Sequence, residues 1–241
     1  MTRALTGASI LPALLALLTA CGGGGGEADV AAAPNPPPVA PDPVVPAPVV
    51  PAPVVPPVGQ LGNLTLVWSD EFSVNGLPDA NKWDYDTDRN KAGWYNNELQ
   101  YYARDRLENA RVEGGRLIIT ARREDLSSAA DWGGQHYTSA RLLTRGKASW
   151  TYGFVEVRAK LPCALGTWPA IWMLGTGGTW PDDGEIDIME QRGTSAVEKG
   201  RVLGTIHTRA YNYFNGTLGP GQGSNTAVPD ACTAFHNYQL T

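Results

Sequence analysis

Short runs of β-branched and aromatic residues recur along the chain from residue 64 onward, and apolar and polar positions partly alternate within them. Clusters of Gly, Asn, Asp and Pro separate the runs, which is typical of strands joined by turns. Apart from one short turn expected near Asn97–Ala103, no amphipathic helix pattern is present. The pattern therefore predicts an all-β sandwich or barrel rather than alternating strands and helices. The clearest runs are Leu64–Trp68, Arg116–Ala121, Tyr152–Lys160 and Val202–His207.

The run at residues 152–160 shows how one such strand is expected to sit. Its apolar and charged side chains alternate from residue 155 to residue 160. Because successive side chains of a strand point to opposite faces, we expect one face to be buried and the other to be wetter. The apolar members are Val155, Val157 and Ala159, and the charged members are Glu156, Arg158 and Lys160.

The first sixty residues follow a different pattern. One basic residue, Arg3, precedes the apolar run Ile10–Leu18, which is too short to span a bilayer as a stable helix. The run ends in Leu18-Thr19-Ala20-Cys21, which resembles the bacterial lipobox, where the signal is cut before a cysteine that then carries lipid. Residues 1–20 are therefore predicted to be a lipoprotein signal peptide, and Cys21 is predicted to anchor an exported protein to the bacterial membrane. The alternative is an ordinary secretory signal with an incidental cysteine.

Residues 21–60 are predicted to connect this anchor to the folded part. Gly22–Gly26 reads as a flexible tether, and residues 34–58 consist mostly of Pro, Val and Ala. Proline fixes φ and removes an N–H donor, so this stretch is expected to be a semi-rigid polyproline II spacer. At ~3.1 Å per residue it would span on the order of 75 Å. Glycine rather than aspartate follows Cys21, which by resemblance to bacterial lipoproteins permits sorting to the outer membrane or the cell surface.

Composition restricts the classes of function. The chain has 241 residues and a net charge of −5 at pH 7, and its Lys and Arg residues are scattered. This argues against nucleic acid as a partner, since a phosphate-binding surface needs a basic patch. Residues 61–241 are enough for one domain with a core. Eight Trp and nine Tyr stand against four Phe, and their flat apolar faces with polar edges suit sugar rings as well as cores.

Three acids alternate with apolar residues at residues 184–190. In a regular strand Glu185 and Asp187 point to the same face, whereas Glu190, five positions after Glu185, points to the opposite face. One extra residue, a β-bulge at position 188 or 189, would return Glu190 to the shared face. Carboxyl groups this close cannot all ionise freely, so at least one pKa should rise. A raised carboxyl beside an ionised one suits retaining glycoside hydrolysis; the alternative is an exposed edge strand with its acids in solvent.

Several segments together resemble glycoside hydrolase family 16. The acid segment matches the family signature, and its extra residue is similar to the laminarinase branch rather than to the lichenase branch, which lacks the bulge. The resemblance extends over residues 64–241 and implies a concanavalin A-like jelly roll and a retaining endo-β-1,3-glucanase. The ordered motifs include Leu66–Phe72, Trp94–Tyr102, Tyr137–Arg141, Gly166–Leu174 and Glu185–Glu190.

The resemblance also implies roles for individual residues. Glu185 would be the nucleophile that forms the glycosyl-enzyme, and Glu190 the acid that protonates the leaving oxygen and then the base that activates water. Asp187 would tune their protonation and orient the nucleophile. The implied substrate-binding residues are Trp168 and Trp172, stacked on glucose rings of the non-reducing side, Asn97 and Arg141, bonded to sugar hydroxyls there, and His207 on the leaving side. Two alternatives stay open: core packing for Trp172 and a cross-strand ion pair for Arg141.

The chain departs from the family pattern in two places. Tyr95 stands where the family often has glycine, which would narrow the cleft. The chain also stops at Phe235–Thr241, which in the family begins a further stretch of several strands. We therefore expect a jelly roll that is incomplete at its C-terminus, with unpaired strand edges, and a 241-residue chain that by itself does not turn over substrate.

The three cysteines divide into one anchor and one pair. If Cys21 carries lipid, Cys163 and Cys232 remain, and a disulfide between them fits an exported protein. The alternative is two buried thiols. No His/Cys cluster has zinc spacing, and no cofactor is required for the implied chemistry. The resemblance implies a structural Ca²⁺ near Glu71 and Gly115, but its last ligand, an aspartate, would lie beyond Thr241, which argues against calcium here.

Other functions stay open at this stage. The first expectation is hydrolysis of laminarin-type β-1,3-glucan, with mixed β-1,3-1,4-glucan as a further substrate, by a monomeric enzyme. The second is an agarase- or carrageenase-like specificity in the same family. A different class is a non-catalytic β-glucan-binding lipoprotein, and a third is a structural lipoprotein. The presence of both Glu185 and Glu190 favours the enzyme.

Overall fold

The structure is a computed structural model, and it describes residues 64–193, 200–217 and 223–241. The expected signal peptide, the lipidation site Cys21 and the linker at residues 21–60 lie outside these ranges. Within them, no segment forms a helix that could span a bilayer.

Nearly all regular structure in the described part of the chain is β, as the alternating pattern predicted. The exception is a single 3-10 turn, η2, at Tyr95–Asn97. The strands are β1 (Asp84–Tyr85), β2 (Gln100–Tyr102), β3 (Ala110–Val112), β4 (Leu117–Ile119), β5 (Arg122–Arg123), β6 (Tyr137–Ser139), β7 (Leu142–Leu143), β8 (Val155–Ala159), β9 (Ala170–Leu174), β10 (Glu185–Glu190), β11 (Arg201–His207), β12 (Gly223–Ala227) and β13 (His236–Leu240).

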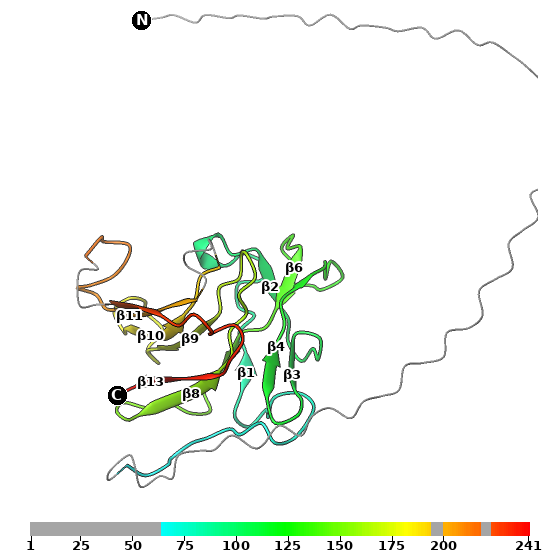
Figure 1. The fold of residues 1–241 in the computed structure, drawn as a ribbon. Helices are drawn as coiled ribbons and strands as arrows, with labels where there is room; N and C mark the ends of the chain where they lie inside the picture. The colour runs from blue at the N-terminus through cyan, green and yellow to red at the C-terminus, as the bar shows by residue number, and fades with distance from the viewer. Residues whose placement is uncertain (1–63, 194–199, 218–222) are drawn as a thin grey trace, which may run out of the picture. The chain divides into compact units, whose positions relative to one another are not determined.

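Two layers of antiparallel strands hold the main core (Figure 1). One layer has the strand order β12-β11-β10-β9, and the other is the pair β8-β13. Met189 of β10 and Tyr238 of β13 belong to one buried cluster between the layers, where they are 1% and 7% exposed. Burying a side chain of this size contributes roughly 1.5–3 kcal/mol, so this cluster helps to hold the two layers together. The same cluster contains Leu161, Val202 and Ala231.

The β8-β13 pair is extended by a disulfide. Cys163 and Cys232 are bonded, with their Cα atoms 5.6 Å apart. Next to it, the Leu161 N–H donates to the Ala231 carbonyl at 2.9 Å, so the segment after β8 and the segment before β13 also pair with each other. Along β8 the alternation expected from the sequence is present: Glu156 and Arg158 are exposed, and the apolar residues between them are partly buried.

Shorter sheets lie beside these layers. β2, β6 and β5 form one sheet in which β2 and β6 are parallel, and β3-β4 and β1-β7 form two antiparallel pairs. Tyr85, Ala110 and Ala140 make a second buried cluster. Asn109 is fully buried there and donates to the Thr138 hydroxyl at 2.8 Å, which satisfies its side chain as burial of a polar group requires.

Two predicted elements are wrong. Leu64–Trp68 forms no strand in the structure, and Leu66 and Val67 are 67% and 78% exposed. The end of this segment is instead held by ring packing: Trp68 contacts Trp83 and Trp150 edge to face, each at 5.4 Å. The short helical turn expected near Asn97–Ala103 ends at Asn97, because the residues that follow pair as β2 with β6.

Candidate active site

The site is built on a β-bulge in strand β10. On one side Asp187 pairs with Trp172 and Met189 with Ile171, so one residue of β10 between them has no partner in β9. On the other side the register to β11 also shifts between Asp187 and Glu190. The bulge predicted at residue 188 or 189 is therefore confirmed. It turns Met189 into the core and returns Glu190 to the face that carries the other two acids.

A glycine in the neighbouring strand makes room for this bulge. A Cβ at Gly204 of β11 would lie 3.4 Å from the Asp187 carbonyl oxygen and 3.1 Å from the Ser224 hydroxyl. A side chain at this position would press on the Ser224 hydroxyl and would touch the backbone of the bulge, so glycine eases the close approach of β11 to β10. The sequence carries this signal as a glycine inside the β-branched run Val202–His207.

The three carboxyl groups share an electrostatic environment. Asp187 is 6% exposed, and burial together with the charges of Glu185 and Glu190 raises its pKa to about 8. Burial also raises the pKa of Glu190, against a hydrogen bond that favours its charged form. At neutral pH Asp187 therefore holds a proton and bonds to Glu185. The rise in pKa expected from the crowding of the acids is confirmed.

Each glutamate accepts a hydrogen bond from an indole. The Nε1 of Trp168 donates to Glu190 Oε1 at 2.8 Å, and the Nε1 of Trp180 donates to Glu185 Oε2 at 2.5 Å. Trp168 was predicted as a sugar-stacking residue, and 45% of its surface is exposed. Trp180 was missed, although its place in a Trp-Pro pair five residues before Glu185 was a signal.

His207 lies opposite Glu185 in the ladder between β10 and β11. Its Nε2 is 3.3 Å from Asp187 Oδ2, and its ring lies 5.9 Å from the ring of Trp180. The other ring nitrogen, Nδ1, is buried without a hydrogen-bond partner among the described residues. The structure therefore places His207 in contact with the acids, on the β11 side of the site.

Arg141 lies between two indole rings on the opposite side of the site. Its guanidinium carbon is 5.1 Å from the ring centre of Trp94 and 4.5 Å from that of Trp172. Its Nε pairs with Asp86 Oδ2 at 3.1 Å. The ion pair kept open as an alternative is thus present, and the stack with Trp94 was missed because it joins residues far apart in the sequence. Trp172, half-buried in β9, pairs with Asp187 across the ladder.

Asn97 and the calcium positions lie away from these contacts. Asn97 is exposed at the end of η2 with a φ of 57°, a conformation that asparagine tolerates better than most residues. None of the contacts above links it to the carboxyl groups. Glu71 is exposed, and among the described residues no group of three His, Cys, Asp or Glu side chains could hold a metal ion.

Comparison with known proteins identifies relatives of this arrangement. A family profile described as "XgeA-like, catalytic GH16 domain" matches residues 114–236. The chain is 56% identical over 180 residues to a beta-glucanase of Rhodothermus marinus, covering 73% of this chain and 58% of that protein. The chain thus spans little more than half the length of this relative.

Solved structures are similar as well. A mutant of SCLam, described as a non-specific endo-beta-1,3(4)-glucanase from family GH16 and co-crystallised with 1,3-beta-D-cellotriosyl-glucose, superposes with a TM-score of 0.70 at 55% identity, over 74% of this chain and 68% of that one. The laminarinase from Rhodothermus marinus gives a TM-score of 0.64 at 56% identity, over 72% and 66% of the two chains. The β-sandwich jelly roll is the fold of these neighbours and of this chain.

Proposed function

This chain belongs to glycoside hydrolase family 16, and from that premise we propose that it forms the catalytic unit of a retaining endo-β-1,3-glucanase. The observation that carries the proposal is the bulged strand β10, which sets Glu185, Asp187 and Glu190 on one face with one carboxyl group protonated at neutral pH. The substrate is a laminarin-type β-1,3-glucan, with mixed β-1,3-1,4-glucan as a further substrate. The names of the relatives support this choice over an agarase-like specificity.

The two glutamates divide the work of a double displacement. Glu185 attacks the anomeric carbon, and Glu190 gives its proton to the leaving oxygen. Glu190 then takes a proton from water, which attacks the same carbon and releases Glu185. The raised pKa of Glu190 suits the first role, because an acid must hold its proton until the bond breaks.

Asp187 and Trp180 position the carboxyl group of the nucleophile, Glu185. Asp187 holds a proton at neutral pH and shares a hydrogen bond with Glu185, which helps to orient the Glu185 carboxyl group. The indole of Trp180 donates a second hydrogen bond to Glu185 and fixes the direction of its carboxylate. His207 contacts Asp187 on its other side and borders the site where the leaving sugar departs.

The non-reducing side of the substrate is held by indole rings. Trp168 and Trp172 offer flat apolar faces next to Glu190 and Asp187. The guanidinium of Arg141 lies between Trp94 and Trp172, and the Asp86 carboxylate balances its charge, so the position of Trp172 is fixed before substrate arrives. Asn97 contributes a hydrogen bond to a sugar hydroxyl on this side.

The location of the protein is a proposal from the sequence alone. Cys21 carries lipid, and the linker at residues 21–60 holds a monomeric domain away from the outer membrane or cell surface, where polysaccharide is met. The resemblance of residues 18–21 to a lipobox supports this arrangement.

The test is a substrate panel on the natural protein. We expect reducing ends to appear with laminarin and, more slowly, with lichenan, and none with agarose. Products analysed early should be oligosaccharides of several lengths, as internal cleavage gives. Glu185→Gln should abolish turnover while laminarin binding and the melting temperature stay close to those of the natural sequence. Hydrolysis of agarose in preference to laminarin, or full activity in Glu185→Gln, would overturn the proposal.

A further inference from the structure

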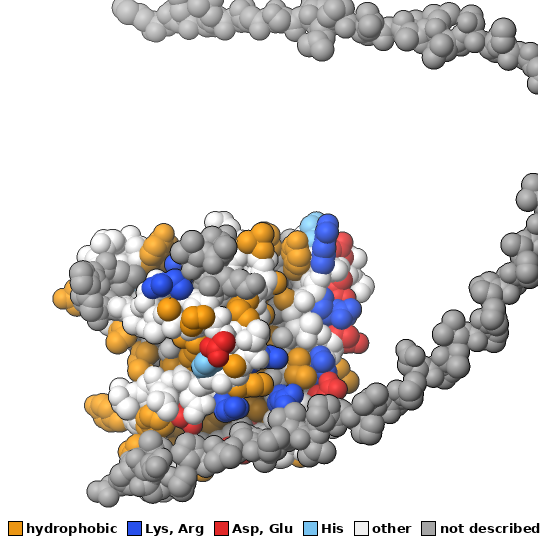
Figure 2. All heavy atoms as spheres, viewed as in Figure 1, with side chains coloured by type: hydrophobic (Ala, Val, Ile, Leu, Met, Phe, Trp, Pro, Cys, Tyr) orange, Lys and Arg blue, Asp and Glu red, His pale blue; other side chains and the backbone are white. Residues whose placement is uncertain are grey.

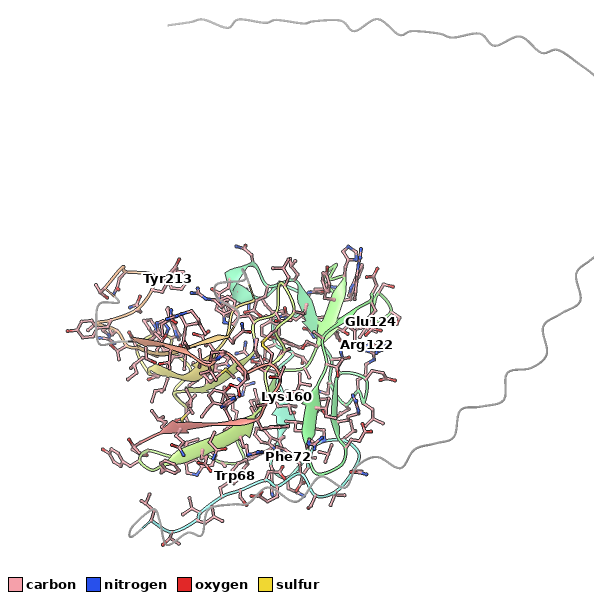
Figure 3. All side chains as sticks on the ribbon, viewed as in Figure 1. Trp68, Phe72, Arg122, Glu124, Lys160 and Tyr213 are labelled. Atoms are coloured by element: carbon pink, nitrogen blue, oxygen red, sulfur yellow. A yellow bond between two sulfur atoms is a disulfide. The ribbon has the colours of Figure 1, made fainter. Side chains whose placement is uncertain are left out.

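A row of exposed aromatic rings leads away from the carboxyl groups on the β11 side of the site. Trp180 is hydrogen-bonded to Glu185, and its ring packs edge to face on Phe214 with 5.3 Å between ring centres. The ring of Phe214 in turn packs edge to face on Tyr213 with 6.1 Å between ring centres. The three rings are 38%, 77% and 75% exposed, in that order. Figure 3 shows Tyr213 at the outer end of the loop, away from the paired strands. None of the roles assigned above uses Phe214 or Tyr213.

The loop that carries the two outer rings, residues 208–217, is held in one conformation by its own hydrogen bonds. Asn212 is 4% exposed at its centre. Its Nδ2 donates to the Thr208 carbonyl at 3.1 Å, and its Oδ1 accepts from the Asn215 N–H at 3.0 Å. The Thr217 hydroxyl donates to the Ala210 carbonyl at 2.7 Å. A loop with such internal bonds can present side chains without first having to order itself.

The same loop is fixed to the segment that precedes β10. The guanidinium of Arg209 binds the Asp182 carboxylate through two hydrogen bonds, at 2.8 and 2.6 Å. Asp182 lies two residues after Trp180, so this contact and the contact between Phe214 and Trp180 join the two loops at neighbouring points. The position of the outer rings relative to Glu185 is therefore set by several contacts.

These rings do little for the stability of the fold. A phenyl ring and a phenol ring that keep three-quarters of their surface in water bury little apolar area. Exposed apolar side chains gathered next to a functional site are a mark of ligand binding. In the space-filling view, hydrophobic side chains project at the end of the domain where this loop lies (Figure 2).

The order of the strands gives the direction of the row. β10 has β9 on one side and β11 on the other. Trp172 and the Arg141 stack lie on the β9 side, which binds the non-reducing part of the substrate in the proposed function. The loop at residues 208–217 follows β11, so its rings lie on the opposite side, where the leaving part of the chain must pass.

We infer that Trp180, Phe214 and Tyr213 form a binding platform for the leaving part of the glucan chain, on which successive sugar rings stack beyond the bond that is cut. This inference rests on the proposed function. Sugar rings offer the apolar faces that aromatic rings bind. A row of three aromatic rings therefore gives additional binding contacts to long chains, and short substrates do not reach them. The platform therefore favours attack within long chains.

The experiment compares long and short substrates. Laminarin extends over the whole row, whereas 4-nitrophenyl β-laminaribioside has only its nitrophenyl group on the leaving side. We expect Phe214→Ala and Tyr213→Ala each to lower the ratio of kcat/KM for laminarin to kcat/KM for the aryl glycoside roughly 2- to 10-fold, as loss of one ring contact would. Tyr152→Ala, at a tyrosine that is 93% exposed in the turn before β8, is the matched control and should leave the ratio as it is.

A second readout uses the acceptor reaction. When a laminari-oligosaccharide replaces water, its hydroxyl oxygen bonds to the anomeric carbon, its proton passes to Glu190, and Glu185 leaves as carboxylate. At high acceptor concentration, Phe214→Ala should give less of the longer transfer product per hydrolysis event than the natural sequence gives.

The outcomes separate the inference from the function on which it rests. If the natural protein does not cut laminarin, the proposed function fails. If it does, and both loop variants keep the substrate ratio and the transfer yield of the natural protein, the platform is wrong. Equal losses on laminarin and on the aryl glycoside would also overturn it, because they indicate a structural role for the loop.

Discussion

The buried acid at position 187 gives a prediction with a definite sign. Unfolded Asp187 ionises near its ordinary pKa of 3.8, whereas in the folded protein burial and two neighbouring carboxylates raise its pKa to about 8. Between these values the folded state holds a proton that the unfolded state has released. The free energy of unfolding therefore falls as the pH rises from about 4 to about 8, and this contribution is fully present only at acid pH.

The magnitude follows from the size of the shift. A difference of about four pKa units sets an upper bound of about 6 kcal/mol on the stability lost across this range. Asp187→Asn removes the titration but keeps a hydrogen-bond donor toward Glu185. Because Glu185 and Glu190 still repel each other in the variant, we expect it to be more stable than the natural sequence by about 1–3 kcal/mol at pH 8, and the difference to close toward pH 4.

Denaturant unfolding at pH 4.5, 6, 7 and 8 measures this difference directly. Asp88→Asn is the control, since Asp88 lies exposed in an ion pair with Arg145 at 2.9 Å. Its effect should stay within about 0.5 kcal/mol at every pH. A difference between Asp187→Asn and the natural sequence that is the same at pH 4.5 and pH 8, or that grows on acidification, would show that Asp187 is not the group that holds the proton.

Three further predictions concern other parts of the chain. Trp168→Phe removes the hydrogen bond that lowers the pKa of Glu190, so the fall of kcat/KM on the alkaline side of its pH profile should move to higher pH. An unchanged pH profile would show that this hydrogen bond does not set the pKa of the catalytic acid. Replacing Cys163 and Cys232 together by alanine should lower the free energy of unfolding by ~4 kcal/mol, as should reduction of the natural protein, and equal denaturation midpoints before and after would contradict it. Cys21→Ser should move the protein from the membrane fraction to the soluble fraction, and continued membrane association would exclude lipid at Cys21 as the anchor.

The catalytic face could be predicted because its signal is local. The spacing along residues 184–190 puts all three acids on one face only if the strand contains a bulge, and acids on one face predict a raised pKa; the structure shows both. Both follow from the geometry of a single strand. The disulfide between Cys163 and Cys232 was predicted from the export signal and from setting Cys21 aside as the lipidation site, and the structure confirms it.

What the sequence could not give depends on contacts between distant segments. Arg141 is stacked by Trp94 and Trp172 because three elements meet, and no spacing along the chain predicts that meeting. Trp180 lies only five residues before Glu185, but its hydrogen bond depends on the conformation of the connection between β9 and β10, which the alternation of residues does not specify. Leu64–Trp68 has the composition of a strand, but a strand also needs a partner, and no ladder forms there among the described residues.

The central claim is that Glu185 and Glu190 act as nucleophile and acid in a double displacement. Proton NMR of the products, recorded within the first minutes of laminarin hydrolysis by the natural protein, reads the configuration at the new anomeric carbon before it equilibrates. Two inversions at that carbon return the original configuration, so we predict that the β anomer appears first and the α anomer follows only by slow mutarotation. Glu185→Ala with added azide should give a glucosyl azide of inverted, α configuration. Initial release of the α anomer by the natural protein would contradict the covalent mechanism and the roles given to both glutamates.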